Sequence, residues 1–206
     1  YMPPPEIAAL REKVRRRAFL VRQRAKLMTK IRVVLAYEGL KPPEGLRLFT
    51  RKGFDWLESL ALEPIGCYLR LIMAFNGEIR RLSLELRRMA GLDEDVRLLM
   101  TVPGVGYYTA LLIKAETGDV NRFKSGEHYS SFIGIVPSTY SSGGVTRHGG
   151  ITHEGNPWLR WAYFEAAMTH VKYDTAISRS YHRIAERRGR KVALVATARR
   201  LALCCY

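Results

Sequence analysis

Residues 64–90, PIGCYLRLIMAFNGEIRRLSLELRRMA, carry a regular pattern of apolar residues. The apolar positions are separated alternately by four and three residues, the spacing of a helix that packs along one narrow seam. The seven positions are Tyr68, Ile72, Phe75, Ile79, Leu82, Leu86 and Met89. The segment therefore predicts a long helix of coiled-coil type. It begins at Pro64, where a missing N–H is tolerated, and ends near Gly91.

A second long helix is predicted before it, from the prolines at residues 3–5 to about Tyr37. Its apolar positions recur every seven residues, but Arg17 and Arg24 interrupt the seam. The seam residues are Ile7, Leu10, Val14, Val21, Met28, Ile31 and Leu35. The two long helices can pair within one chain as an antiparallel hairpin or between two chains as a dimer, and periodicity favours neither.

The charge of the chain indicates a polyanionic partner. The 206 residues include 34 Lys and Arg against 19 Asp and Glu, a formal net charge of +15. Ten basic residues lie between Arg11 and Arg32, with Glu12 as the only acid among them. Such a run is either a solvated helix face or a surface that follows phosphates, and we favour the phosphate surface.

The sequence gives little support for a membrane protein or for a metal-binding protein. No stretch of about 18 residues is free of charge, and the first ten residues lack the pattern of a secretory signal. The three cysteines, Cys67, Cys204 and Cys205, fit a reducing compartment and have no zinc-binding spacing. We therefore expect a cytoplasmic protein with no membrane partner and no metal site in this chain.

The stretch Val102-Pro103-Gly104-Val105-Gly106 precedes an amphipathic helix and resembles a helix-hairpin-helix motif. The glycines permit a tight turn, and the N–H groups that begin the next helix attract an anion. A DNA phosphate, bound without reading of sequence, is the natural ligand. Gly104, Val105 and Gly106 are thus candidate DNA-binding residues; the alternative is a turn that binds nothing.

The segment from Gly134 to Thr152 is rich in Gly, Ser and Thr, which predicts an exposed, bending segment. Composition alone makes Ser142 a turn residue. Residues 157–206 are predicted to be helical, with a basic stretch at Arg187–Lys191 that is either solvated or a nucleic-acid contact. The predicted fold is therefore mainly α. A basic long-helix pair, residues 1–90, precedes a compact helical domain with the helix-hairpin-helix, residues 91–206.

Four short motifs occur in order in the second half of the chain. They are Pro-Gly-Val-Gly at 103–106, Phe-x-Gly-Ile-Val-Pro at 132–137, Ser-Ser-Gly-Gly at 141–144, and Ile-Thr-x-x-Gly-Asn-x-x-Leu-Arg at 151–160. This ordered set resembles the C-terminal domain of the insertion sequence one-ten family of transposases, also called bridge-RNA-guided recombinases. The resemblance covers residues 92–206 well and the basic helices before them more loosely.

The resemblance implies that a serine before glycine joins covalently to a DNA phosphate. Ser142 matches that serine, and Ser141 is the neighbouring alternative. Arg160 matches the family's Leu-Arg pair, whereas His153 stands where the family has lysine, which makes a cationic role there dependent on pH. Arg147, His153 and Arg160 are candidate DNA-binding cations.

The family also implies partners beyond duplex DNA: a structured guide RNA, other copies of the protein, and a divalent metal, magnesium, on an N-terminal RNase-H-like domain with four acidic residues. No acidic quartet on strand patterns precedes the helical region here, so we expect that domain to be missing and the isolated chain to be inactive. Two other functions stay open. One is a helix-hairpin-helix module that binds DNA without cutting it; the other is a coiled-coil assembly or RNA-binding protein.

Overall fold

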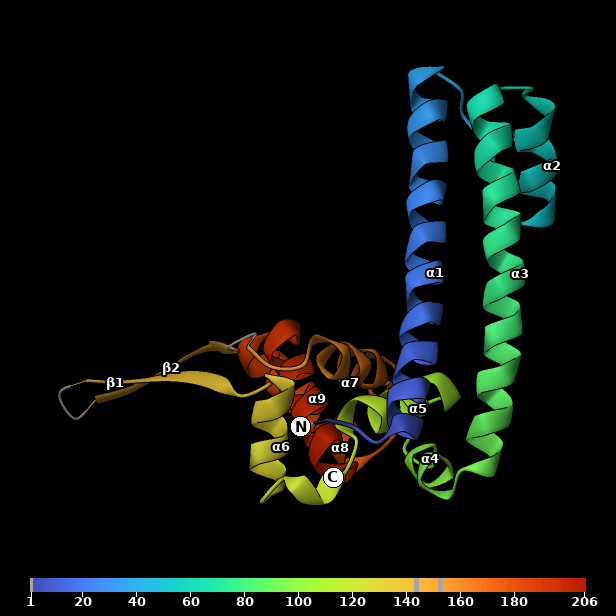
Figure 1. Ribbon diagram of the computed structural model, residues 1–206. Coiled ribbons are helices and arrows are strands. Elements are labelled where there is room, and N and C mark those ends of the chain that lie inside the picture. The colour runs from blue at the N-terminus through green and yellow to red at the C-terminus, as the bar shows by residue number, and fades with distance from the viewer. Residues whose placement is uncertain (1, 143–144, 152–153) are drawn as a thin grey trace. The chain divides into compact units, whose positions relative to one another are not determined.

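The computed structural model describes residues 2–142, 145–151 and 154–206, and it divides the chain into two compact units (Figure 1). One unit is Arg15–Glu85, and the other combines Tyr1–Val14 with Leu86–Tyr206. Leu10, Val14, Leu86 and Ala90 share one hydrophobic core, so the ends of both long helices belong to the second unit. The boundary predicted at residue 91 lies just inside that unit.

The unit Arg15–Glu85 is built from helices α1 (Pro5–Tyr37), α2 (Arg51–Ser59) and α3 (Glu63–Leu92). Its core consists of six buried residues: Ile31, Leu35, Leu57, Ile65, Leu69 and Ile72. Thr50 caps α2 by accepting a hydrogen bond from the Gly53 N–H, and Leu57 is the residue that α2 contributes to this core. Each of the three helices therefore buries an apolar stripe in this shared core.

The long helices pair within the chain, antiparallel. Arg17 Nε donates to Ser83 Oγ at 2.8 Å, and Arg24 Nη1 donates to Asn76 Oδ1 at 2.9 Å. A step of seven residues along α1 is thus matched by a step of seven in the opposite direction along α3, which is two turns of each helix. Of the two arrangements that periodicity left open, the structure has the hairpin.

The seam of α3 differs in part from the predicted one. Ile72, Ile79, Leu82 and Leu86 are buried as expected, but Tyr68, Phe75 and Met89 are only half-buried. Ile65, Leu69 and Ala90 are buried in addition. The half-buried polar residues Asn76 and Ser83 face the arginines of α1. The sequence pattern missed these polar positions because it considered only apolar residues.

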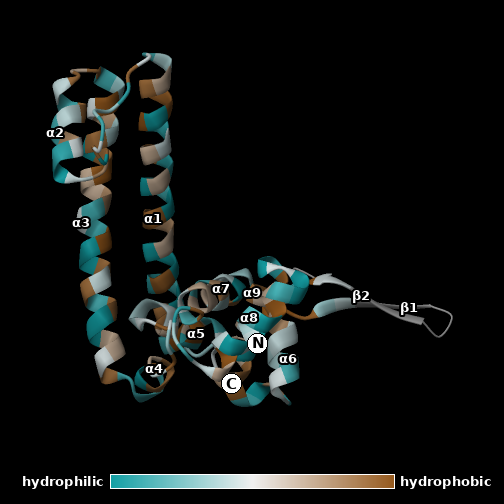
Figure 2. Ribbon diagram, turned by 180° about the vertical axis from the view of Figure 1, so that it is seen from behind, coloured by the Kyte–Doolittle hydropathy of each residue, from teal (hydrophilic) through white to brown (hydrophobic). Residues whose placement is uncertain are grey.

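The second unit consists of helices α4 to α9 around one core (Figures 1 and 2). Their bounds are α4 Glu94–Leu99, α5 Tyr107–Thr117, α6 Gly126–Ile133, α7 Pro157–His170, α8 Ala176–Arg188 and α9 Arg190–Cys204, with a short 3-10 helix at Val120–Arg122. Alanines 162, 166, 198 and 202 are fully or almost fully buried, which lets α7 and α9 pack closely. The mainly helical fold predicted from the sequence is confirmed.

A two-stranded sheet replaces most of the predicted bending segment. Strand β1 (Pro137–Ser142) pairs antiparallel with β2 (Val145–Ile151), and the hairpin projects from the helices of its unit (Figure 1). The register shifts between Pro137 and Thr139, opposite Gly149 and Gly150. Glycines at such a bulge are common because the strand must bend there. The segment predicted as exposed and bending is thus a pair of strands over these residues, which the sequence did not reveal because it carries no alternation of apolar and polar side chains.

No helix in the described part of the chain is long and apolar enough to cross a membrane.

We predict that Asn76→Leu lowers the free energy of unfolding by about 1–3 kcal/mol, because half-buried Arg24 loses its hydrogen-bond acceptor. Replacing both partners, Arg24→Leu with Asn76→Leu, should recover most of this loss, since no polar group is then left facing an apolar one. Urea denaturation of the two single variants, the double variant and the exposed control Arg80→Leu measures the coupling. An Asn76→Leu protein as stable as the control would contradict the prediction.

Candidate nucleic-acid interface

The turn between α4 and α5 is short and tightly hydrogen-bonded. Asp93 caps α4 by accepting from the Val96 N–H at 3.1 Å, and the Val105 N–H donates to the Val102 carbonyl at 3.0 Å. Gly106 is the N-cap of α5, is exposed, and has no side chain hydrogen-bonded to the helix start. No side chain therefore caps the start of α5, and whether an anion binds there stays a prediction.

Lys114 fixes the angle between these two helices. Its Nζ lies 2.7 Å from Asp93 Oδ2 and 2.8 Å from Asp95 Oδ2. Burial alone would raise the pKa of Asp93, but hydrogen bonds from Lys114 and the Val96 N–H outweigh it and lower that pKa below its ordinary value. Asp93 is thus charged at neutral pH, and both Asp93 and Asp95 are engaged with Lys114.

A cation also stands next to the start of α5. The Arg87 guanidinium lies over the Tyr107 ring, 5.2 Å from its centroid. Tyr107 is the first residue of α5. A positive side chain, the positive end of the helix dipole and open N–H groups therefore occur together at this turn.

Gly104 allows the turn to pack against α7 and does not provide space for a ligand. Its φ is +94°, and a Cβ there would lie 2.5 Å from the Ala166 carbonyl oxygen and 2.9 Å from the His170 nitrogen. The turn therefore rests on the end of α7. Val105 is 5% exposed and belongs to the core, so it can offer a ligand only its backbone. Of the three candidate residues in this turn, Gly106 is the one with open space around it.

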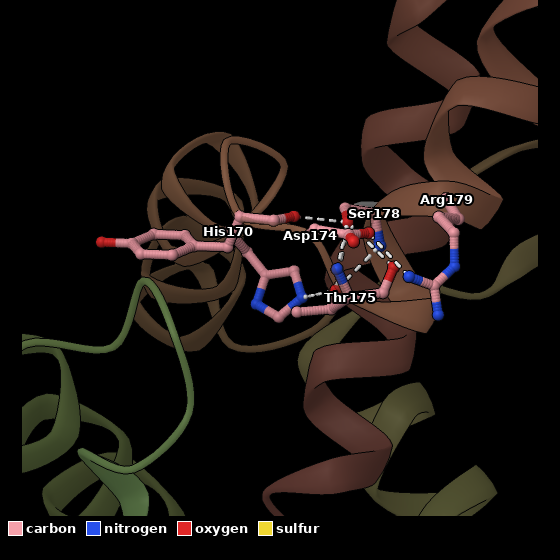
Figure 3. Close-up of polar contacts among 6 residues, drawn as sticks. His170, Asp174, Thr175, Ser178 and Arg179 are labelled. Atoms are coloured by element: carbon pink, nitrogen blue, oxygen red, sulfur yellow. Dashed lines mark hydrogen bonds and ion pairs between the residues drawn. The ribbon is translucent and has the colours of Figure 1, made fainter.

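His170 joins this turn to the α7–α8 connection (Figure 3). His170 Nδ1 lies 2.7 Å from the Pro103 carbonyl oxygen, and Nε2 lies 2.8 Å from Thr175 Oγ1. A carbonyl only accepts, so Nδ1 carries the proton and, in a neutral ring, Nε2 accepts from the threonine hydroxyl. Thr175 in turn forms a capping box with Ser178 at the start of α8.

The β1–β2 hairpin leaves the helices where two glycine backbones touch. A Cβ on Gly155 would lie 2.2 Å from Gly134 N and 2.3 Å from Ile133 C. Gly134 caps the C-terminus of α6 in the left-handed region, with φ of +78°, and the Asn156 N–H donates to the Phe132 carbonyl. Only glycine allows this approach, so the two ends of the hairpin are fixed side by side.

The buried side chain of Glu116 also helps to hold the base of the hairpin in place. The Glu116 side chain is 1% exposed and accepts from Asn156 Nδ2 at 2.9 Å, while Arg11 lies 3.8 Å from it. Asn156 Oδ1 accepts from the N–H groups of Trp158 and Leu159 and so caps α7. A single amide side chain therefore connects α5, α7 and the hairpin base.

The structure places the predicted site residues on and beside this hairpin. Ser142 is the last paired residue of β1, opposite Val145; Ser141 is opposite Thr146, and Arg147 is opposite Tyr140. Half-buried Arg160 donates from Nη1 to the Ile133 carbonyl at 3.4 Å, at the hairpin base. His153 lies outside the described residues. The candidates thus fall at two ends of one element, Ser142 at its tip and Arg160 at its base.

Three nucleophilic side chains in the core of this unit are held protonated. Burial raises the pKa of Tyr129 to about 12 and that of Cys205 to about 12. Burial also raises the pKa of Tyr163 well above its ordinary value. None of these groups is a ready nucleophile at neutral pH. The described residues contain no group of three or more His, Cys, Asp or Glu arranged to hold a metal ion.

Sequence reasoning missed Glu116, His170 and Gly155 as determinants of this region. Glu116 and His170 are buried polar residues whose partners are 40 and 67 positions away in the sequence. A single sequence shows such residues only as polar positions within helices. The Gly155–Asn156 pair was visible as part of a motif, and Asn before Pro157 is a recognisable helix start.

Residues 96–183 match the family described as "Transposase IS116/IS110/IS902 family". The chain is 33% identical over 190 residues to the "Transposase for insertion sequence element IS1111A" of Coxiella burnetii, covering 87% of this chain and 52% of that protein. It is 29% identical over 212 residues to a "Probable family 20 transposase" of Pseudomonas aeruginosa, covering 94% of this chain and 61% of that protein. These matches confirm the resemblance read from the four ordered motifs.

A shorter match reaches a protein with a different name. Over 78 residues the chain is 32% identical to the "Pilin gene-inverting protein" of Moraxella bovis, covering 37% of this chain and 24% of that protein. The chain spans about half the length of the curated transposases that it matches over most of its own length.

We predict that His170→Ala lowers the free energy of unfolding by about 1–3 kcal/mol, because the Pro103 carbonyl and the Thr175 hydroxyl, both on half-buried residues, lose a partner. His170→Asn should lose less, since its amide N–H can still reach the Pro103 carbonyl. Denaturant unfolding followed by circular dichroism compares the two variants with wild type. Equal stability of wild type and His170→Ala would show that the contact does not hold the turn.

Proposed function

We propose that this chain, whose residues 96–183 form a domain of the IS116/IS110/IS902 transposase family, is the DNA-binding and strand-transfer part of an insertion-sequence transposase. The observation that supports this most is the projecting hairpin, in which Ser142 is the last paired residue of β1. Two relatives are named as transposases and a third as a gene-inverting protein, names that agree with a reaction on DNA.

Duplex DNA is the proposed substrate, and the α4–α5 turn is one proposed point of contact. The exposed N-terminus of α5 at Gly106 and the neighbouring Arg87 offer hydrogen-bond donors and positive charge to a backbone phosphate. The net charge of +15 supplies a sequence-independent attraction. Such contacts position the duplex and leave the choice of sequence to another partner.

Ser142 is the proposed nucleophile. Its Oγ attacks the phosphorus of a DNA phosphodiester, an Oγ–P bond forms, one P–O bond of the strand breaks, and the serine proton is taken up by base. Attack by a strand end on the phosphoserine reverses these steps and rejoins DNA. Arg147 and His153 are proposed to offset the phosphate charge, and Arg160 to act from the hairpin base through its contact with the Ile133 carbonyl.

The remaining components of the reaction are proposed to come from outside these residues. The proposal requires a divalent metal held on an acidic domain outside these residues, which would supply Lewis-acid chemistry at the phosphate. The described residues do not fit such an ion, because they contain no cluster of three candidate ligands. A structured guide RNA and further copies of the protein complete the proposed assembly.

A second candidate function is a module that binds DNA without cutting it. The observation in its favour is that Arg160 donates to the Ile133 carbonyl. This contact gives Arg160 a structural role at the hairpin base that needs no reaction on DNA. The basic helical hairpin Arg15–Glu85 favours a third function, assembly or RNA binding by the long helices. These alternatives predict no covalent link between protein and DNA.

We predict that Gly106→Asp weakens binding to duplex DNA while preserving or slightly raising thermal stability. Aspartate at the N-cap occupies the first N–H groups of α5 and adds negative charge where a phosphate would lie. The dependence of log Kobs on log salt should become shallower by about 0.9, one phosphate contact. Fluorescence anisotropy with a short duplex at several salt concentrations measures both quantities.

Gly106→Asn is the matched control, because asparagine caps the helix equally well without a charge. It should lose less affinity than Gly106→Asp. If Gly106→Asp binds duplex DNA as wild type does, the turn only joins two helices and the phosphate-binding reading is wrong.

We predict that Ser142→Ala abolishes recombination by the full-length protein and leaves DNA binding unchanged. The methyl side chain cannot form a phosphoester, whereas loss of one hydroxyl hydrogen bond costs only about 1 kcal/mol of stability. The measurement is a denaturing gel of full-length protein incubated with DNA, guide RNA and magnesium, in which a covalent adduct migrates slowly.

Ser141→Ala is the control on the neighbouring position and should keep the adduct. An adduct that survives in Ser142→Ala but disappears in Ser141→Ala would move the nucleophile by one residue. Adducts that survive both changes would exclude this strand as the covalent centre and favour the non-cutting module.

A further inference from the structure

The junction of α8 and α9 carries a dense group of exposed positive charges. Residues 183–191 hold five basic side chains and one acid, Glu186, a net charge of +4 in nine residues. The five cations are Arg183, Arg187, Arg188, Arg190 and Lys191, and all are exposed. Among the described residues none of them has an ion pair, in contrast to Arg179 with Asp174 and Arg199 with Glu127 on the same two helices. We call this group the α8–α9 cation cluster.

A groove lies directly beside the cluster. A hollow of about 700 Å³ is lined by α9 and by the base of the β1–β2 hairpin, and its lining includes the apolar residues Ile135, Val195 and Ala196 and the cations Arg188 and Arg199. A smaller hollow of about 210 Å³ shares Arg188, Val192 and Ala196 with it and adds Arg187. The two hollows are adjacent, because they share these three residues, and arginine side chains line both; together we call them the groove.

The chemistry of this groove fits a phosphate backbone. Gly189, with φ of +84°, is both the C-cap of α8 and the N-cap of α9, so the opposite ends of two helix dipoles meet there and the positive potential comes from the five cationic side chains. None of the described residues that line either hollow is aromatic, so they offer unpaired bases no ring to stack on. A membrane surface is disfavoured because these apolar residues line a hollow, whereas a membrane-binding face protrudes.

The position of the groove relates it to the hairpin. Pro137, Gly149, Gly150 and Ile151, at the base of the hairpin, line the groove, and the hairpin departs beside α9 (Figure 1). Ser142 lies five residues further along β1, which at the rise of an extended strand is about 17 Å. This length corresponds to about five base pairs of a DNA duplex.

We propose that the α8–α9 cation cluster and its groove bind the backbone of duplex DNA about five base pairs from the phosphodiester that reaches Ser142. The choice of duplex DNA and of Ser142 as reference point rests on the proposed function. The cluster is a contact separate from the α4–α5 turn and holds the duplex from the side of the hairpin base.

The test compares two double variants that remove the same charge from the same unit. Arg187→Gln with Arg188→Gln removes two cations that line the groove. Lys124→Gln with Lys172→Gln removes two exposed cations that lie elsewhere and have no ion pair among the described residues. Binding of the whole chain to a short duplex of arbitrary sequence is measured by anisotropy across a range of salt.

The groove variant should bind duplex DNA more weakly, and its salt dependence should become shallower by about 1.8, the value for two phosphate contacts. The lysine variant should keep the wild-type slope. Equal losses in the two variants would mean that only bulk charge matters and would overturn the proposal. Failure of wild type itself to bind duplex DNA would instead overturn the proposed function, on which the proposal rests.

Two further probes separate the possible polyanions. If the groove variant loses affinity for a structured RNA or for vesicles of anionic lipid but not for duplex DNA, the surface belongs to that other partner and the proposal is wrong. Hydroxyl-radical footprinting of the full-length protein should show that the groove variant loses protection about five base pairs from the phosphate joined to Ser142. Lost protection next to that phosphate would contradict the geometry.

Discussion

The contact between the backbones of Gly134 and Gly155 determines where the hairpin leaves the helical unit. A side chain at Gly155 would lie 2.2 Å from the Gly134 nitrogen, so the end of α6 and the start of α7 approach as closely as two backbones can. Asn156 then bonds to Phe132, to the first N–H groups of α7 and to buried Glu116. These bonds satisfy polar groups that would otherwise be buried without partners. A rigid base is what a short, projecting two-stranded hairpin needs, because an isolated hairpin is marginally stable in water.

The arginines of α1 have a comparable role in the unit Arg15–Glu85. Two arginines in an apolar seam cost stability, since Arg24 Nε is buried without a hydrogen-bond partner among the described residues. The facing residues Asn76 and Ser83 supply acceptors at these two levels. A shift of one heptad in the pairing would place Arg24 opposite Ser83 in one direction, which leaves Asn76 without its arginine. In the other direction it would place Arg24 opposite buried, apolar Leu69. We therefore infer that the polar layers select one register.

The sequence predicted the helices well and the contacts between them poorly. Strong heptad spacing revealed α1 and α3, and caps such as Asp93, Ser125 and Gly134 are readable as local signals. Whether the long helices pair within the chain was not readable, because it depends on the matching of polar residues 52 and 66 positions apart. The strands were missed for a related reason. Strand β1 is made of Pro, Ser, Thr and Tyr, and β2 carries apolar residues only at its two ends, Val145 and Ile151, so no alternation of apolar and polar residues marks either strand (Figure 2).

The site was predicted from motifs, and the structure gives those motifs different physical roles. Gly104 and Gly106 look alike in the sequence, yet Gly104 packs against Ala166 and His170 while Gly106 has open space. Gly155 and Asn156 read as part of one motif with Arg160, and all three act at the hairpin base. Residues that hold a projecting element in place are under as tight a steric constraint as residues that meet a substrate. The family motifs in this chain therefore contain both residues that hold the hairpin in place and residues proposed to meet the substrate. The geometry of the structure distinguishes the positions at the hairpin base from those at its tip.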